Sequence, residues 1–211
     1  MMKKIIIMGA GGHGQVVADA LLLMKGATPV AFLDDNPEIT GKKILGIPVI
    51  GGYSALNTIE HDGIVLALGN NGLRKRIFNE LTAAGETLFT VIHPSAIIAP
   101  SVKMGNGCMI LAGAIINTGA EIKDNTIINT NSTVEHHNII GPHSHIAPGA
   151  TLGGKVIVGE ESMIGIGATV LPRVKIGNKA MLGAGSTANR RIADGVTAAG
   201  MPARKLKFQN N

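Results

Sequence analysis

Four of the seven histidines lie close together in the second half of the chain, at positions 136, 137, 143 and 145. Histidine changes its charge near neutral pH, so such a group could supply a general base or bind a metal ion. A zinc site is disfavoured, because adjacent residues of an extended segment point to opposite faces and no cysteines or carboxylates complete a tetrahedral set. We expect no metal. His136 is the candidate general base, with a surface histidine that has no role as the alternative, and His143 and His61 are expected to face the solvent.

A second group of candidates surrounds a glycine-rich loop near the start of the chain. The motif Gly-x-Gly-x-x-Gly at residues 9–14 joins an apolar run at 4–8 to a helical run at 15–25. Glycines between a strand and a helix let backbone amides approach a phosphate at the helix N-terminus. The pair Asp34-Asp35 ends the next apolar run, where a carboxylate commonly holds a ribose hydroxyl. We expect a nucleotide here, and the small size of the region favours a mononucleotide or sugar nucleotide over NAD.

Further polar residues belong to the same predicted sheet edge. Gly69 and two asparagines follow the apolar run 64–68, and ligands of such folds bind at the carboxyl ends of the strands. Arg74 and Lys75, one turn into the next helical segment, could neutralise a phosphate. His13 in the glycine loop could contact the ligand or cap the loop.

The elements that must position these residues differ between the two halves of the chain. Apolar runs alternate with helical segments from residue 1 to about residue 92, which predicts a small Rossmann-like parallel sheet. His93-Pro94 marks a change of rhythm, because a proline cannot continue a central strand. We expect one domain at 1–92 and a second at 93–211.

The second half carries a repeat of six residues. An aliphatic residue stands at every sixth position from Ile98 to Leu182, and a small or slim residue follows each of them four positions later. This period fits neither an α-helix nor a single alternating strand, and it is the signature of a parallel β-helix. Three sides make one coil, so residues eighteen positions apart should stack on each other.

This stacking rule gives the candidate base a neighbour. Gly154 stands eighteen residues after His136, and a bare backbone position over the imidazole leaves room for a flat acyl donor. Cys108 belongs to the slim series, so we expect it to serve packing and not to be a nucleophile. For His145, packing or a satisfied hydrogen bond is a serious alternative to a functional role.

Composition limits the class of protein. Aromatic residues make up only 2% of the 211 residues, so the core must consist of stacked aliphatic side chains. The net charge of +5 is scattered and aromatic stacking platforms are scarce, which argues against a nucleic-acid partner. Basic clusters at 74–76, 190–191 and 204–207 fit phosphorylated small molecules better. No apolar run approaches the roughly 20 residues of a membrane span. With one cysteine and no recognisable signal peptide, we expect a cytoplasmic protein without membrane insertion.

Six motifs in one order carry a family resemblance. They are Gly-x-Gly-x-His-Gly, Phe-Leu-Asp-Asp, Ala-Leu-Gly-Asn-Asn, Ile-His-Pro-Ser-Ala, Val-Glu-His-His and a late Gly-Met-Pro-Ala-Arg. Together they resemble the NeuD/PglD family of bacterial sugar O- and N-acetyltransferases, over nearly the whole chain. The resemblance implies a left-handed parallel β-helix after the α/β domain, acetyl-CoA as co-substrate, and a homotrimer with active sites between neighbouring subunits.

The resemblance also implies roles for individual residues. His136 matches the catalytic base. The positions matched to contacts with a UDP-sugar are Gly11, Gly12, His13, Asp34, Asp35, Gly69 and Asn129. The positions matched to contacts with acetyl-CoA are His145, Gly154, Ile166 and Ala184.

The chain departs from the family pattern beside the base. His137 stands where the family usually has a glutamate or an aspartate. Either the base works without that partner or another acid, such as Glu135, takes its place. His137 itself remains a second catalytic candidate.

The activity implied by the resemblance is acetyl-CoA-dependent N-acetylation of a UDP-linked 4-amino-4,6-dideoxy sugar, of the UDP-N-acetylbacillosamine pathway type. Transfer would be direct, with a histidine as general base. The alternatives are an O-acetyltransferase acting on sialic acid or another sugar, and a non-catalytic scaffold that binds a nucleotide sugar. The sequence leaves the identity of the sugar open, and also the choice between an amine and a hydroxyl acceptor.

Overall fold

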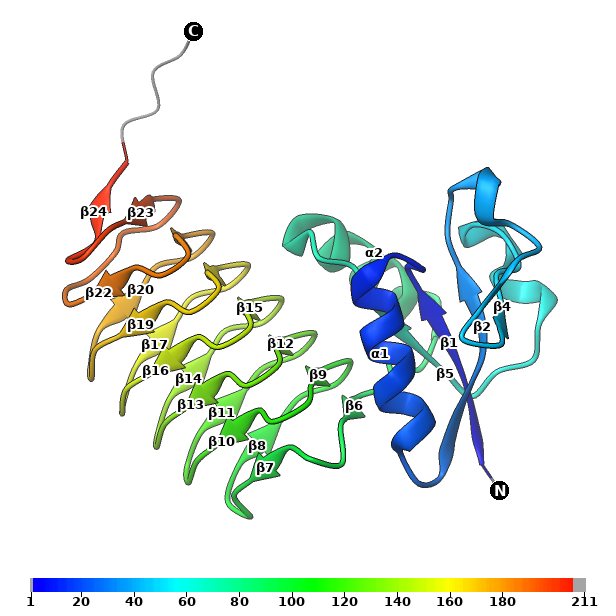
Figure 1. The fold of residues 1–211 in the computed structure, drawn as a ribbon, viewed down its shortest axis with the longest axis horizontal. Coiled ribbons are helices and arrows are strands. Elements are labelled where there is room, and N and C mark those ends of the chain that lie inside the picture. The colour runs from blue at the N-terminus through cyan, green and yellow to red at the C-terminus, as the bar shows by residue number, and fades with distance from the viewer. Residues whose placement is uncertain (1, 207–211) are drawn as a thin grey trace, which may run out of the picture. The chain divides into compact units, whose positions relative to one another are not determined.

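The computed structural model describes residues 2–206 and separates into two compact units, Met1–Pro94 and Ser95–Asn211. The first is an α/β unit and the second is a parallel β-helix (Figure 1). Neither helix among the described residues has the length and apolar character that crossing a membrane requires.

A three-stranded parallel sheet forms the centre of the first unit, in the order β2-β1-β5. Its strands are β1 (Lys3–Met8), β2 (Ala27–Leu33) and β5 (Gly63–Leu66). The helices are α1 (Gly12–Leu23) and α2 (Asn71–Ala83). Side chains of the strands and α2 meet in one buried cluster that includes Ile6, Leu33, Leu66, Phe78 and Leu81.

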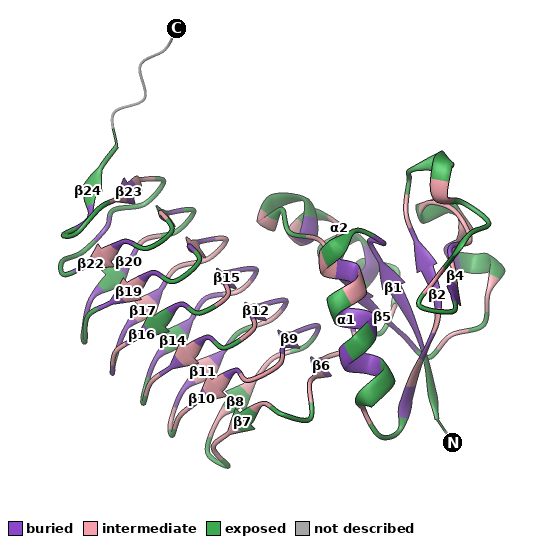
Figure 2. Cartoon of the chain, viewed as in Figure 1, coloured by how far each residue is buried: buried purple, intermediate pink, exposed green. Residues whose placement is uncertain are grey.

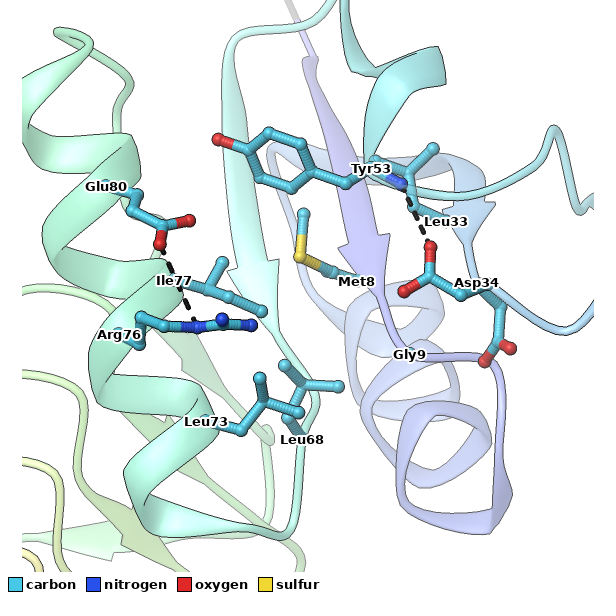
Figure 3. A pocket seen from close by; sticks show the side chains of 11 residues that line it. Met8, Gly9, Leu33, Asp34, Tyr53, Leu68, Leu73, Arg76, Ile77 and Glu80 are labelled. Atoms are coloured by element: carbon cyan, nitrogen blue, oxygen red, sulfur yellow. Dashed lines mark hydrogen bonds and ion pairs between the residues drawn. The ribbon is translucent and has the colours of Figure 1, made fainter.

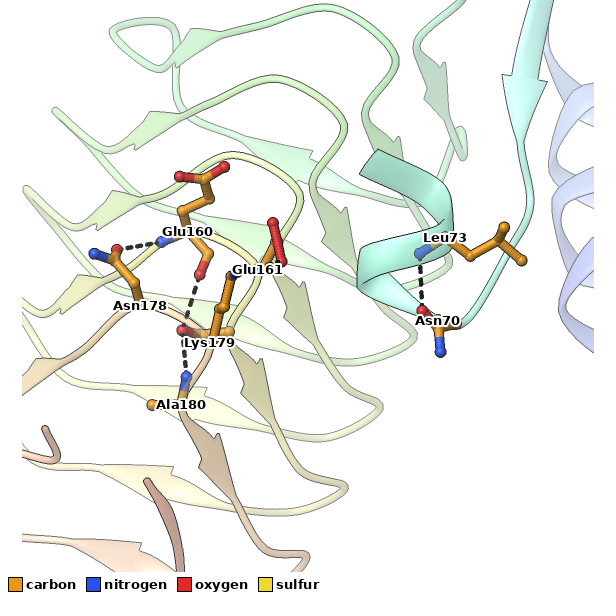
Figure 4. A network of polar contacts seen from close by, with 8 residues as sticks. Asn70, Leu73, Glu160, Glu161, Asn178, Lys179 and Ala180 are labelled. Atoms are coloured by element: carbon orange, nitrogen blue, oxygen red, sulfur yellow. Dashed lines mark hydrogen bonds and ion pairs between the residues drawn. The ribbon is translucent and has the colours of Figure 1, made fainter. Parts of the chain in front are cut away.

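Shorter elements complete this unit. They are η1 (Pro37–Ile39), the antiparallel pair β3 (Lys43–Ile44) and β4 (Ile47–Pro48), η2 (Tyr53–Thr58) and β6 (Val91–Ile92). Helix α1 begins at Gly12, so the glycine motif itself forms its N-terminus. Helix α2 begins after Asn70, whose Oδ1 accepts a hydrogen bond from the Leu73 amide at 2.9 Å (Figure 4).

Two-residue strands of the second unit form three parallel sheets. The first contains β7 (Ile97–Ile98), β10 (Ile115–Ile116), β13 (Thr133–Val134), β16 (Thr151–Leu152), β19 (Thr169–Val170) and β22 (Thr187–Ala188). The second contains β8 (Lys103–Met104), β11 (Glu121–Ile122), β14 (Ile139–Ile140), β17 (Ile157–Val158) and β20 (Lys175–Ile176). The third contains β9 (Met109–Ile110), β12 (Ile127–Ile128), β15 (His145–Ile146), β18 (Met163–Ile164), β21 (Met181–Leu182) and β23 (Thr197–Ala199), with β24 (Arg204–Lys205) antiparallel at its end.

The six-residue period sets this architecture, as the sequence predicts. The second residue of each regular strand is the repeated aliphatic residue, and from Ile110 onward these side chains lie in the core (Figure 2). Parallel partners are eighteen residues apart, for example Val134 and Leu152. From Gly107 to Gly185, each hexad turns at a residue with a left-handed backbone, such as Gly149 (φ 67°).

The turns align in three rows along the β-helix. The basic edge lies between the first and second sheets and comprises His136, His137, Gly154, Lys155, Pro172, Arg173, Arg190 and Arg191. The glycine edge lies between the third and first sheets and comprises Pro148, Gly149, Ile166, Gly167, Ala184 and Gly185. The amide edge lies between the second and third sheets and comprises Asp124, Asn125, Pro142, His143, Glu160, Glu161, Asn178 and Lys179. On the amide edge, side chains tie neighbouring coils together, and Asn178 Oδ1 accepts a hydrogen bond from the Glu160 amide at 2.9 Å (Figure 4).

Candidate active site

His136 and His137 form an exposed pair at the turn between β13 and β14. Their Nδ1 atoms are 3.1 Å apart, and the rings meet edge to face with centroids 5.3 Å apart. The neighbouring coils fix the backbone on both sides. The His137 amide donates to the Thr118 carbonyl, and the Lys155 amide donates to the His136 carbonyl, each at 2.9 Å.

The expectation that these two side chains point to opposite faces is wrong. It assumes an extended segment, but His137 has a left-handed backbone with φ 57°. At such a turn the two side chains no longer alternate, so the rings can lie side by side.

Gly154 lies against His136, as the eighteen-residue spacing predicts. A Cβ atom at Gly154 would lie 2.6 Å from Cε1 of His136 and in closer conflict with its Nε2. The imidazole therefore occupies the place that a side chain at residue 154 would need. Since Gly154 does not have a positive φ, the backbone alone does not require glycine there.

Glu135 does not contact either imidazole. Its Oε2 accepts from the backbone amide of His136 at 3.2 Å, and its Oε1 accepts from Asn117 Nδ2 at 3.0 Å. The ring partner of His136 is thus His137, a possibility that the sequence left beside that of Glu135.

His145 and Asn129 form a second, separate pair on the third sheet. Asn129 Nδ2 donates to His145 Nε2 at 3.0 Å, and both residues are only 8% exposed. An amide nitrogen can only donate, so the neutral His145 carries its proton on Nδ1. Asn129 is fixed in turn, because its Oδ1 accepts from the Thr130 amide at 2.8 Å.

The four residues matched to acetyl-CoA therefore fall into two groups. Gly154 lies with His136 on the basic edge, whereas Ile166 and Ala184 lie on the glycine edge. His145 lies on the sheet that leads into the glycine edge. The Ile166 side chain is 61% exposed, which is unusual for an isoleucine. A single β-helix does not bring these two groups to one place.

Positive charge continues along the basic edge beyond the histidines. Lys155 and Arg173 follow His137 at eighteen-residue intervals. Neither was predicted as a site residue, although the eighteen-residue spacing could have identified both. The row leads to a cavity of about 250 Å³ at the last coil, lined by Arg190, Arg191, Arg204 and Lys205 with small apolar residues. Lys207, predicted to join this cluster, lies outside the described residues.

A pocket of about 270 Å³ opens in the first unit at the carboxyl ends of β1 and β2 (Figure 3). Gly9, Asp34 and Asp35 line it together with Tyr53, Arg76 and Glu80. Arg76 belongs to a basic cluster that the sequence assigned to phosphorylated ligands, whereas Tyr53 and Glu80 were not predicted as site residues. Asp34 Oδ2 accepts from the Ala10 amide at 2.8 Å, and Asp35 Oδ1 accepts from the Tyr53 amide at 3.4 Å. The two carboxylates thereby hold the glycine loop and η2 around the pocket.

Gly11, Gly12 and Gly69 do not line this pocket. A Cβ atom at any of the three would meet no heavy atom within 4 Å, and none of them has a positive φ. Gly14 differs, because a side chain there would collide with the backbone of Gly9. Neither packing nor backbone strain accounts for the first three glycines, whereas close approach of a ligand would.

His13 and Arg74 lie in the interior beside the glycine loop. Burial lowers the pKa of His13 to about 4, and the positive charge of Arg74 contributes to that shift. Arg74 is fully buried and its Nη1 donates to the Leu68 carbonyl at 2.9 Å. The expectation that Arg74 neutralises a ligand phosphate is therefore wrong, and Arg76 lies at the pocket instead.

Three further candidates are assigned to structural contacts. His143 is 6% exposed with its Nδ1 2.9 Å from Asn125 Nδ2, and His61 Nε2 is 3.1 Å from Glu86 Oε2, so the prediction that both face solvent is wrong. Cys108 is fully buried, and burial raises the pKa of its thiol to about 11. Its predicted packing role is confirmed. Within residues 2–206, no group of three histidine, cysteine, aspartate or glutamate side chains is arranged to hold a metal ion.

Comparison with known proteins gives matches for both units. Residues 4–81 match the family model of the PglD N-terminal domain, and residues 155–190 match that of the bacterial transferase hexapeptide with six repeats. The acetyltransferase domain of PglB from Neisseria gonorrhoeae is 38% identical, with a TM-score of 0.92 over 97% of this chain and 100% of that chain. The same domain has also been solved in complex with acetyl coenzyme A.

The descriptions of two other relatives each name an amino sugar. PerB from Caulobacter crescentus, solved with CoA and GDP-perosamine, is 36% identical, with a TM-score of 0.91 over 98% of this chain and 99% of that chain. The UDP-N-acetylbacillosamine N-acetyltransferase of Bacillus subtilis is 40% identical over 113 residues. That match covers 53% of this chain and 52% of the Bacillus enzyme, so it spans about half the length of that relative.

Proposed function

Since the chain belongs to the PglD-type family of hexapeptide-repeat acetyltransferases, we propose that it transfers the acetyl group of acetyl-CoA to the amino group of a nucleotide-linked sugar. The observation that carries the proposal is the exposed imidazole of His136, which packs directly against the backbone of Gly154 in the following coil. For the acceptor we propose a UDP-linked 4-amino-4,6-dideoxy sugar. The name of the Bacillus relative supports UDP and the bacillosamine type of sugar.

In the proposed reaction, His136 acts as the general base. The sugar amine attacks the thioester carbonyl, a C–N bond forms and the C–S bond breaks. The amine proton passes to Nε2 of His136 and from there to the departing thiolate, which leaves as CoA. No covalent enzyme intermediate and no metal is required.

The Gly154 amide is the donor that we assign to the developing oxyanion. The neighbouring Lys155 amide already donates to the His136 carbonyl, whereas the Gly154 amide makes no hydrogen bond to any described residue. A backbone donor of this kind commonly contributes about 3 kcal/mol to transition-state stabilisation.

The basic edge supports a long, phosphate-bearing co-substrate. Neighbouring coils are about 4.8 Å apart, so Arg173 and Arg191 stand roughly 10 and 15 Å along the edge from His137. An extended acyl-CoA with its thioester at His136 would direct its phosphates toward the cavity lined by Arg190, Arg191, Arg204 and Lys205. Guanidinium groups suit such phosphates, because they form paired hydrogen bonds.

We propose that two subunits of a homotrimer build each active site. The predicted contacts to acetyl-CoA occupy two edges of the β-helix, and the exposed Ile166 on the glycine edge suits an interface better than solvent. In a ring of three copies, the basic edge of one copy would face the glycine edge of the next. His136 and Gly154 would then come from one subunit, and His145, Ile166 and Ala184 from its neighbour.

In the first unit, the pocket beside β1 and β2 is the proposed nucleotide site. Asp34, Asp35 and Tyr53 offer hydrogen-bonding groups and an aromatic face for the nucleoside. Gly11, Gly12 and Gly69 would allow backbone groups to approach the phosphates, as their lack of packing partners suggests.

The variant His136→Ala tests the base. We expect kcat to fall by at least about 100-fold with little change in KM, because a general base acts mainly in the transition state. Thiol release from acetyl-CoA, with UDP-4-amino-4,6-dideoxy-N-acetylglucosamine as acceptor, gives the rate. Lys103→Ala, at an exposed position of the second sheet, should keep wild-type activity.

A kcat near that of the wild type in His136→Ala would contradict the assignment of the base. If the wild type leaves the UDP-amino sugar untouched and acetylates a hydroxyl of sialic acid or another sugar, N-acetylation is wrong and O-acetylation replaces it. Tight UDP binding without any release of CoA would instead indicate a binding protein.

A further inference from the structure

The partner of the base in this chain is a second histidine. The Nδ1 atoms of His136 and His137 are 3.1 Å apart, which is hydrogen-bonding distance. Two imidazole nitrogens can share a hydrogen bond only when one carries a proton and the other offers a lone pair. In the neutral pair, one ring must therefore hold its proton on Nδ1 and the other on Nε2.

We propose that His137 is a positioning residue that holds His136 in the tautomer needed for catalysis. In this arrangement, His136 donates its Nδ1 proton to His137, and the lone pair of His136 stands on Nε2. The inference rests on the proposed function, in which Nε2 of His136 is the base. In this pair, the neutral imidazole of His137 orients the base.

The two rings pack against different neighbouring coils. The His136 ring lies against the backbone of Gly154 in the following coil, with Nε2 as its nearest atom to the place that a Cβ there would take. The His137 ring lies instead against Gly119 in the preceding coil. A Cβ atom at Gly119 would lie 2.8 Å from Cδ2 and 3.0 Å from Nε2 of His137. Both rings thus have a glycine close to Nε2, and the direction of the hydrogen bond follows from the proposed role of His136 as the base.

The backbone holds His137 in this place. Its φ of 57° and the hydrogen bond from its amide to the Thr118 carbonyl fix the direction of the Cα–Cβ bond. The Lys155 amide fixes the His136 carbonyl from the other side. Because its backbone is fixed and its side chain is short, His137 can hold the His136 ring in one orientation.

The charged groups around the pair distinguish this arrangement from one based on a carboxylate. Among the described residues, neither ring of the pair has a hydrogen bond to a carboxylate. Glu135 is bound to a backbone amide and to Asn117, and the preceding coil contributes Thr118 and Gly119. The following coil contributes Lys155, with Arg173 one coil further on the same edge. The partner of the base in this pair is therefore an imidazole and not a carboxylate.

Two substitutions at His137 separate orientation from folding. His137→Gly removes the ring while suiting the left-handed backbone, and His137→Glu supplies a charged acceptor at the same position. We expect kcat of His137→Gly to fall by about 10-fold to 100-fold, with KM for both substrates within about 2-fold of wild type. In His137→Glu we expect most of kcat to return, and the acidic limb of kcat/KM to move up by about one pH unit.

The matched control is Lys179→Gly, which has the same backbone conformation at φ 52° on the amide edge and should keep both kcat and the pH profile. An unchanged kcat and pH profile in His137→Gly would overturn the proposal. So would a His137→Glu variant that is as inactive as His137→Gly, because a merely structural role is not restored by an acceptor.

Nitrogen NMR of ¹⁵N-histidine-labelled protein reads the tautomer directly, without substrate. His136 should carry its proton on Nδ1 in the wild type and shift toward Nε2 in His137→Gly, whereas an unchanged tautomer would overturn the inference. A wild type that acetylates no amino sugar would overturn the proposed function instead, and the NMR experiment would still decide the pair.

Discussion

His13 shows how one buried residue links the glycine loop to pH. Its ring is enclosed beside Arg74, and desolvation is the main cause of its lowered pKa. Sequence analysis placed His13 in the loop and left its role open between ligand contact and capping. The burial of the His13 side chain depends on how α1 and α2 pack, and a local sequence motif does not predict this packing.

The lowered pKa predicts a pH-dependent stability of the first unit. The pKa falls from 6.5 to about 4 on folding, so between these values the unfolded chain binds more protons than the folded one. Stability is therefore complete above the unfolded value and is lost as the pH falls toward the folded value. Between pH 6.5 and about pH 5, His13 should remove about 2 kcal/mol from the free energy of unfolding.

Urea denaturation at these two pH values measures the effect. The chain has one tyrosine and no tryptophan, so the fluorescence of Tyr53 follows the unit that contains His13. His13→Asn should lose less stability than the wild type on acidification. Equal losses in both proteins would rule out a contribution from His13.

Residue types alone predicted some candidates well and others poorly. Cys108 belongs to the buried slim series, and its packing followed from the spacing. His61 and His143 were wrongly assigned to the surface, because their partners Glu86 and Asn125 are far from them in sequence. Such pairings form only once the chain has folded.

At the scale of elements, the period of six was sufficient to predict the strands, their inward residues and their partners. It could not predict the direction of side chains at the turns. Each turn has a left-handed residue, and this geometry brings His136 and His137 together where an extended segment would separate them. In the first unit, alternating patterns predicted the parallel sheet, but not that η2 would bring Tyr53 to the pocket.

Stacking between neighbouring coils predicts the effect of Gly154→Ala. The new methyl group would collide with Cε1 and Nε2 of His136, while the backbone at this position accepts alanine. We expect kcat to fall by at least about 10-fold, because the methyl group would displace the imidazole of the base from its position. The midpoint of thermal unfolding should change little.

A double variant provides the control for this prediction. If Gly154→Ala acts through the imidazole, adding it to His136→Ala should cause little further loss, since the two changes disable the same group. Additive losses would mean that the methyl group acts elsewhere.

At the scale of the whole molecule, the division of the predicted contacts between two edges is the main finding. The sequence contained this information, because Gly154 and Ile166 are not separated by a whole number of eighteen-residue coils. In the proposed homotrimer, a neighbouring copy would bring the two groups of contacts together. The order of residues along the β-helix followed from the spacing, whereas the homotrimer is an expectation from the family resemblance alone.

Mixed trimers test whether two subunits share each site. His136→Ala disables the basic edge, and His145→Ala disables the opposing set, so each variant alone should be nearly inactive. Co-expression of both variants in equal amounts should restore about a quarter of the wild-type sites. In a randomly assembled trimer, each site has an intact His136 with a probability of about one half and an intact His145 with the same probability. No restoration would place the whole site within one chain.

The unbroken register of coils also restricts how the gene can change. An insertion of one hexad would leave every strand sound, yet it would rotate all later turns by one edge and carry Gly154 away from His136. Only the gain or loss of a complete coil keeps the chemical rows aligned. Recombination in this family should therefore be tolerated in steps of whole coils. Coils added or lost beyond the last basic residues would change the length of the β-helix without separating Gly154 from His136.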